Sequence, residues 1–121
     1  MKVKVYFNLH RKLFSVVALE GPKRGRVIAH EHSLILMYAT FRVSEAGRQR
    51  VLREKRKNVH AFVVGQWWDH PWMENLGAEE ITYNPYKFST FVRKEGLEPI
   101  HGASCVWLKN RRIWALDIDQ P

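Results

Sequence analysis

Short apolar runs with a strand-like period dominate this sequence and leave room for one helix. Residues 2–9 alternate apolar and polar side chains, as in a strand with one buried face. Gly21-Pro22-Lys23-Arg24-Gly25 is a turn, because glycine and proline there favour a sharp change of direction. Such a chain must bury its apolar faces within a sheet. The other strand-like runs are residues 13–19, 26–32, 34–42, 59–67 and 79–92, the last interrupted at Asn84-Pro85-Tyr86.

The helix-like stretch spans residues 42–57. Ser44 suits an N-cap, so we expect a helix from about 44 to 57. Gly47 within it costs a helix about 1 kcal/mol. The apolar stripe through Gly47 and Val51 is narrow. The helix can therefore bury one stripe on a sheet while it exposes a basic surface.

The last part of the sequence predicts a hairpin over residues 104–118. A two-residue turn at Asn110-Arg111 would place Trp107 opposite Trp114. Arginine is a poor second residue for that turn, so a longer loop is an alternative. Earlier in the chain, the 34–42 run is expected to carry a bulge near Met37.

These elements predict an α+β fold in a single domain, residues 1–121. We expect one curved antiparallel sheet of about six or seven strands, packed on one basic helix (44–57), with the 104–118 hairpin at the end. A length of 121 residues suits one domain. With 45% apolar and 26% charged residues, the composition is that of a globular chain.

Positive charge is concentrated in the first half of the chain. Residues 1–60 hold 14 Lys or Arg against 4 Asp or Glu, a net charge of +10, whereas residues 61–121 hold 6 against 8, a net of −2. Residues 42–57 alone hold 7 basic and 2 acidic residues, a net of +5. A surface of this kind attracts polyanions. Dispersed charge would serve solubility equally well.

The leading hypothesis is a non-enzymatic module whose helix contacts nucleic-acid phosphates. Tyr38, His60, Trp67 and Trp68 would add stacking if they lie nearby. An acidic protein partner or a merely solvated helix face are the alternatives, since no helix-turn-helix, zinc-finger or RNA-recognition motif accompanies the charge. The residues expected at the phosphates are Arg48, Arg50, Arg53, Lys55, Arg56 and Lys57.

Three tryptophans gather in residues 67–72. Trp68 and Trp72 could anchor a protein partner, because tryptophan is enriched in binding hot spots. Trp68 and Trp72 could equally pack over the open end of a small core. We expect Trp67 to be a core residue. The second hypothesis is therefore an inhibitor or adaptor that binds an acidic host protein.

Histidines give a third hypothesis, a His-dependent nuclease. His30 and His32 flank Glu31 on a predicted strand, a spacing able to bind zinc if a third ligand is present. With nearby cations, these histidines and His60 could act as acid and base on a phosphodiester. No spacing marks such a pair or such a ligand, and no Walker, GxSxG or dinucleotide motif occurs. We therefore expect no metal, no cofactor and no catalytic residue.

The single cysteine, Cys105, cannot form an intramolecular disulfide and suits a reducing compartment, where we expect it to be a small buried hydrophobe. The first seven residues alternate charged and apolar side chains and do not resemble a signal peptide. The uncharged run 33–41 is far shorter than the about 18–20 residues of a membrane span. These features predict a soluble cytoplasmic protein.

Four segments resemble small proteins encoded by tailed bacteriophages. They are Lys4-Val5-Tyr6-Phe7-Asn8-Leu9-His10, residues 44–53, residues 57–63, and Tyr83-Asn84-Pro85-Tyr86-Lys87. The resemblance implies a phage accessory protein that acts in the cytoplasm of the bacterial host. It supplies no catalytic residue. Phage proteins of this size bind nucleic acid or block host machinery, which is an analogy of role only.

Overall fold

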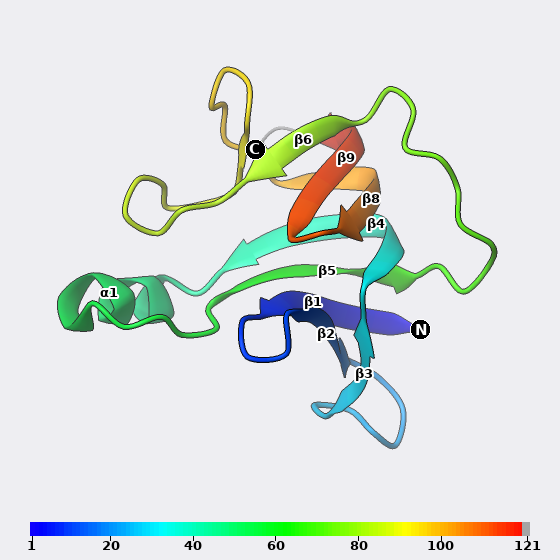
Figure 1. The fold of residues 1–121 in the computed structure, drawn as a ribbon, viewed down its shortest axis with the longest axis horizontal. Helices are drawn as coiled ribbons and strands as arrows, with labels where there is room; N and C mark the ends of the chain where they lie inside the picture. Colours follow the sequence, from blue (N-terminus) through cyan, green and yellow to red (C-terminus); the bar gives the residue numbers. More distant parts are fainter. Residues whose placement is uncertain (120–121) are drawn as a thin grey trace.

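The computed structural model describes residues 1–119 as one antiparallel sheet and one short helix (Figure 1). The elements in chain order are β1 (Lys2–Asn8), β2 (Leu13–Ala18), β3 (Val27–Glu31), β4 (Ser33–Val43), α1 (Glu45–Glu54), β5 (Ala61–Trp67), β6 (Glu79–Thr82), β7 (Val92–Arg93), β8 (Gly102–Lys109) and β9 (Arg112–Asp119). The order within the sheet is β3-β2-β1-β5-β4-β8-β9-β6-β7.

The sheet has nine strands, which corrects the expected six or seven. One cause is that the 79–92 run forms two short strands, β6 and β7, that pair with each other. Asn84 turns the chain between them, because its carbonyl accepts the N–H groups of Lys87 and Phe88. Its side chain accepts the N–H of Tyr86. The single strand-like run 79–92 is thus a hairpin of two short strands.

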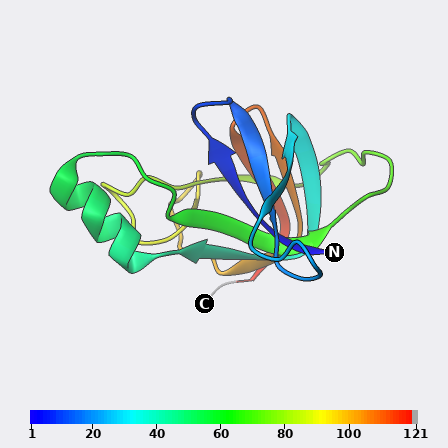
Figure 2. The same cartoon turned by 90° about the horizontal axis from the view of Figure 1, so that it is seen from below.

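The helix is shorter than expected and does not lie on the sheet. Ser44 caps it through a hydrogen bond from the Gly47 N–H (3.2 Å). It ends at Lys55, whose φ of 58° is left-handed and so stops the helix before residue 57. Figure 2 shows α1 extending beyond the ends of β4 and β5 instead of covering a face, and only Val51 of the helix is buried. No helix within residues 1–119 is long and apolar enough to cross a membrane.

A single residue, His32, forces the sheet to roll. β3 is at one edge and β4 is four strands away, yet His32 alone separates them in the chain. In a flat sheet the two strands would lie about 19 Å apart at a spacing of about 4.8 Å. Residues 31 and 33 can be at most about 7.6 Å apart. The strands from β3 to β4 therefore curl round a common core, which contains buried side chains from β1, β2, β4, β5 and β8.

A bulge in the central strand β4 is confirmed, and two glycines make room for it. The register of β4 against β5 shifts between residues 37 and 40, and Tyr38 has a left-handed φ of 52°. Leu36 faces the core before the bulge and Ala39 faces it afterwards. A Cβ on Gly65 of β5 would lie 2.9 Å from the Met37 carbonyl oxygen, and one on Gly102 of β8 would lie 2.6 Å from the Ala39 carbonyl oxygen. Each neighbouring strand thus carries glycine opposite the bulge.

The C-terminal hairpin confirms the expected pairing of Trp107 with Trp114. Its turn has two residues, because Asn110 (φ 53°) and Arg111 (φ 64°) are both left-handed. Cys105 lies in the same strand as Trp107 and is buried, as expected of a small hydrophobe. Burial raises the pKa of the Cys105 thiol to about 11.

Candidate functional site

The helix α1 sits on His60, the residue before β5. A Cβ on Gly47 would lie 2.5 Å from the His60 Cβ, so glycine permits a contact that no other residue allows. His60 is buried, with 6% of its surface exposed. The helix-weakening glycine of the sequence is therefore the contact point between α1 and the rest of the fold.

His60 is held by hydrogen bonds at both ring nitrogens. Its Nδ1 lies 3.1 Å from the Asn58 carbonyl and 3.0 Å from the Asn58 Oδ1. Both of these partners are acceptors, so Nδ1 carries the hydrogen and Nε2 accepts from the Tyr83 hydroxyl (2.7 Å). A base in catalysis needs a free nitrogen that can reach substrate. His60 in this arrangement instead joins the segment after α1 to the end of β6.

Tyr83 gives a pH-dependent prediction. Burial raises the pKa of its hydroxyl to about 12 from an ordinary 10.0. The folded state retains this proton while the unfolded chain loses it, so the contribution to stability is complete below pH 10 and declines as pH rises toward 12. An ultraviolet titration of the native protein should show a tyrosine step near pH 12 that is absent from Tyr83→Phe. If both proteins give the same alkaline titration and the same loss of stability, Tyr83 is not the group responsible.

Arg48 connects the helix to the turn after β6. Its Nε donates to the carbonyl oxygens of Pro85 (3.0 Å) and Phe88 (2.9 Å). Its guanidinium also pairs with Glu45 (3.2 Å), and 17% of the Arg48 side chain is exposed. The pKa of Glu45 is lowered by a hydrogen bond from Gln49 and by the charge of Arg48. Arg48 therefore holds the helix in place, a role that differs from the expected phosphate contact.

The other expected cations are exposed and gather at the end of the molecule formed by α1. No side chain within residues 1–119 hydrogen-bonds or ion-pairs with Arg50, Arg53, Arg56 or Lys57. The Lys55 Nζ lies 5.7 Å from the centre of the Tyr86 ring. The α1 cations, defined as Arg50, Arg53, Lys55, Arg56 and Lys57, are thus available to a ligand.

A groove of about 850 Å³ lies next to these cations. Its walls come from residues 6–10, 57–61 and 83–86, together with Val51 and Arg111. None of the described residues that line it is acidic. We call this hollow the rim groove, because it follows the loops at one end of the rolled sheet. It combines aromatic rings with cationic side chains and touches the segment that carries the α1 cations.

No pattern in the sequence indicates the rim groove as a unit. Its walls come from parts of the chain that are far apart in sequence, and only the roll of the sheet brings them together. Tyr86 and Arg111 both line it, although no pattern in the sequence marks either of them as a ligand contact. An exposed aromatic residue after the Asn84-Pro85 turn is the one local hint of a surface role.

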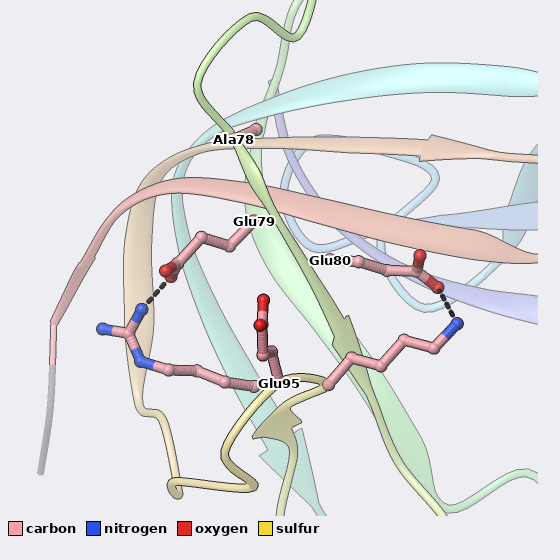
Figure 3. A pocket seen from close by; sticks show the side chains of 6 residues that line it. Ala78, Glu79, Glu80 and Glu95 are labelled. Atoms are coloured by element: carbon pink, nitrogen blue, oxygen red, sulfur yellow. Dashed lines mark hydrogen bonds and ion pairs between the residues drawn. The ribbon is translucent and has the colours of Figure 1, made fainter.

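A second hollow, of about 500 Å³, lies between β6 and β7 and is filled with its own ion pairs (Figure 3). Glu79 pairs with Arg93, and Glu80 pairs with Lys94 at 3.2 Å and with Arg112. Hydrogen bonding from Arg112 is the main cause of the lowered pKa of Glu80. Glu79 and Glu80 are thus satisfied by cations within the fold and are not free to bind a ligand.

The tryptophan loop lies at the opposite end of the molecule from α1 (Figure 1). Trp67 packs against the main core, as expected, and Trp68 packs against a smaller cluster around Trp107. Trp72 is more open, with 43% of its surface exposed. Of the residues expected to add stacking beside the helix, Tyr38, Trp67 and Trp68 do not line the rim groove, and His60 lines it but is buried.

The other histidines do not converge. The Nδ1 atom of His30 lies 3.1 Å from the hydroxyl oxygen of Ser15 on the neighbouring strand β2. His32 is exposed at the corner between β3 and β4. Within residues 1–119, no group of three or more His, Cys, Asp or Glu side chains is arranged to hold a metal ion.

Comparison with known proteins gives the family. The family model described as the Mycobacterium phage L5 gene 82 protein matches residues 1–116. The chain belongs to the phage L5 gene 82 family. The gene 82 protein of Mycobacterium phage L5 is 40% identical over 121 residues, which covers 95% of each chain. The resemblance to phage proteins is thereby confirmed, and no solved structure matches the chain. The name of the gene 82 relative states no activity, so no functional residue is transferred from it.

Proposed function

We propose that this protein is a non-enzymatic nucleic-acid-binding protein that acts in the cytoplasm of the phage host. The observation that carries the proposal is the set of α1 cations. Five basic side chains are exposed on and just after one short helix, and four of them have no side-chain partner within residues 1–119. Phosphates are bound by such cations through release of counterions, which needs no base-reading motif.

The position of the helix supports this function. α1 projects from the end of the sheet, so its outer surface is not covered by another element (Figure 2). Gly47, Arg48 and Val51 face inward and hold it. The residues that hold the helix are thus not among the α1 cations. The α1 cations can therefore be neutralised without removing the contacts that hold the helix in place.

A charge-removal experiment tests the proposal. The triple variant Arg50→Gln, Arg53→Gln, Arg56→Gln should weaken binding to a fluorescently labelled oligonucleotide in an anisotropy titration. Three lost phosphate contacts should lower the slope of log affinity against log salt by about 2–3. Measurements at two salt concentrations give both quantities.

A matched control separates the site from general charge. Lys23→Gln, Arg24→Gln, Arg26→Gln removes the same charge from the exposed turn between β2 and β3, which lies away from α1 in both views (Figure 1 and Figure 2). This control should bind as the unaltered protein does. Absence of binding to any DNA or RNA at low salt, or equal loss in the two triple variants, contradicts the proposal.

A protein partner is the second candidate. The loop between β5 and β6 exposes two large apolar side chains, Trp72 (43%) and Leu76 (83%). Such residues anchor protein interfaces. Affinity purification from host lysate with and without nuclease distinguishes the two functions. A partner that survives nuclease and is lost in Trp72→Ala supports a host-protein target, whereas loss of all partners on nuclease treatment supports nucleic acid.

A further inference from the structure

The rim groove has apolar surface that phosphate binding alone does not require. Leu9, Val59 and Tyr86 line it and are 46%, 52% and 54% exposed. Phosphates contact cations, whereas exposed aromatic and aliphatic groups in a cationic groove suit a flat, weakly polar ligand. Nucleic-acid bases are such ligands, and they stack on tyrosine rings.

Charge around the groove is complementary to a nucleic-acid backbone. Arg111 and Lys57 line it, and Lys55 lies over the ring of Tyr86. The guanidinium of Arg111 is 4.9 Å from the centre of the Phe7 ring. None of the described lining residues is acidic, so the charged side chains that an anion contacts in the groove are all positive.

The walls of the groove are fixed before a ligand arrives. Asn8 Oδ1 accepts the N–H groups of His10 and Arg11, each at 3.0 Å. Asn84 Oδ1 accepts the N–H of Tyr86 at 2.9 Å. Asn58 holds His60 from the third wall. Preformed pockets of about 300–1,000 Å³ are typical of small-molecule and cofactor sites, and the groove volume of about 850 Å³ is within this range.

Arg111, which lines the groove, and Lys55, which lies over the Tyr86 ring beside it, occupy backbone positions that favour glycine. Lys55 ends the helix with φ 58°, and Arg111 is the second residue of the hairpin turn with φ 64°. Glycine is preferred at both kinds of position. A positive side chain at each place is consistent with a ligand that needs the charge.

From these observations we propose that the rim groove receives unpaired bases of a single-stranded nucleic acid, with a base stacked on Tyr86 and the phosphates along the α1 cations. This inference rests on the proposed function and names its ligand class. In a duplex the base faces are stacked on one another, so only a single strand can offer them to Tyr86.

The test compares a labelled oligo(dT) and oligo(U) with a labelled duplex of equal length by anisotropy. The unaltered protein should bind a single strand more tightly than the duplex. Tyr86→Ala should weaken single-strand binding by about 5- to 150-fold, the range for loss of one stacked base, and Tyr86→Phe should retain it. Tyr38→Ala is the matched control, because Tyr38 is also exposed (77%) but does not line the groove. Comparison of oligo(dT) with oligo(U) tells which nucleic acid is preferred.

Arg111→Gly keeps the inference testable even if Tyr86→Ala unfolds. Glycine should raise the thermal midpoint by relieving the turn, while single-strand affinity falls several-fold. A fall in both quantities would mean that Arg111 is structural and would overturn its role here. Equal binding of duplex and single strand, with Tyr86→Ala unchanged, overturns the inference but leaves the proposed function intact. No binding of any nucleic acid overturns both.

Discussion

Replacing Gly102 with alanine is expected to lower the free energy of unfolding by about 1–3 kcal/mol, the usual cost of overpacking. A methyl group there would lie 2.6 Å from the carbonyl oxygen of Ala39. This oxygen belongs to the backbone of the β4 bulge, so it cannot rotate away as a side chain would. Strand propensity alone predicts the opposite sign, because alanine is favoured over glycine by about 0.5–1 kcal/mol. Urea unfolding curves of the unaltered protein and of Gly102→Ala decide which of the two signs is correct.

Ser104→Ala is the control for this prediction. Ser104 is in the same strand, two residues further on, and is exposed. A surface change of this size should alter stability by no more than about 0.5 kcal/mol. A Gly102→Ala protein as stable as the unaltered chain would show that β4 can shift its bulge, and the glycines would then not be needed to hold it.

Gly47→Ala should also destabilise the fold, although it places a better helix former in α1. Helix propensity favours alanine by about 1 kcal/mol. The new methyl would lie 2.5 Å from the Cβ of buried His60, at the root of that side chain, so the helix itself must move. The overpacking cost of about 1–3 kcal/mol exceeds the gain in propensity. We expect a net loss of stability in urea unfolding.

Ala46→Gly gives the complementary measurement. Ala46 is exposed on the same helix, so glycine there should cost about 1 kcal/mol through propensity only. Both substitutions are then destabilising, although one adds a methyl group and the other removes one. If Gly47→Ala instead stabilises the protein, the close contact between α1 and His60 is not tight, and Gly47 has no special role.

Local patterns in the sequence predict the strands and their pairing better than the overall arrangement. The alternation around Trp107 and Trp114 predicts their pairing because both residues belong to one hairpin with a short turn. The bulge near Met37 is also predicted, and the structure shows that the core-facing positions change there from even (Leu36) to odd (Ala39). The helix end at Lys55 is missed, since the usual glycine signal for a left-handed residue is absent.

Long-range features could not be predicted for a different reason. The roll of the sheet depends on the β3–β4 corner at His32, which has no distinctive composition. The partners of Arg48 are carbonyl oxygens of Pro85 and Phe88, and backbone acceptors leave no trace in side-chain patterns. Charge alone therefore placed Arg48 with the binding residues. The same charge pattern correctly located the exposed cations Arg50, Arg53 and Arg56 on the surface.

The pairing of β4 with β8 has a consequence for synthesis on the ribosome. The first five strands emerge early and can pair among themselves, because β4 finds β5 just after α1. The other edge of β4 has no partner until residues 102–109 have been made. An open edge in a central apolar strand is a template for pairing with another chain. Nascent chains that stall before β8 are therefore the form of this protein most exposed to aggregation, and arrival of the last hairpin closes that edge.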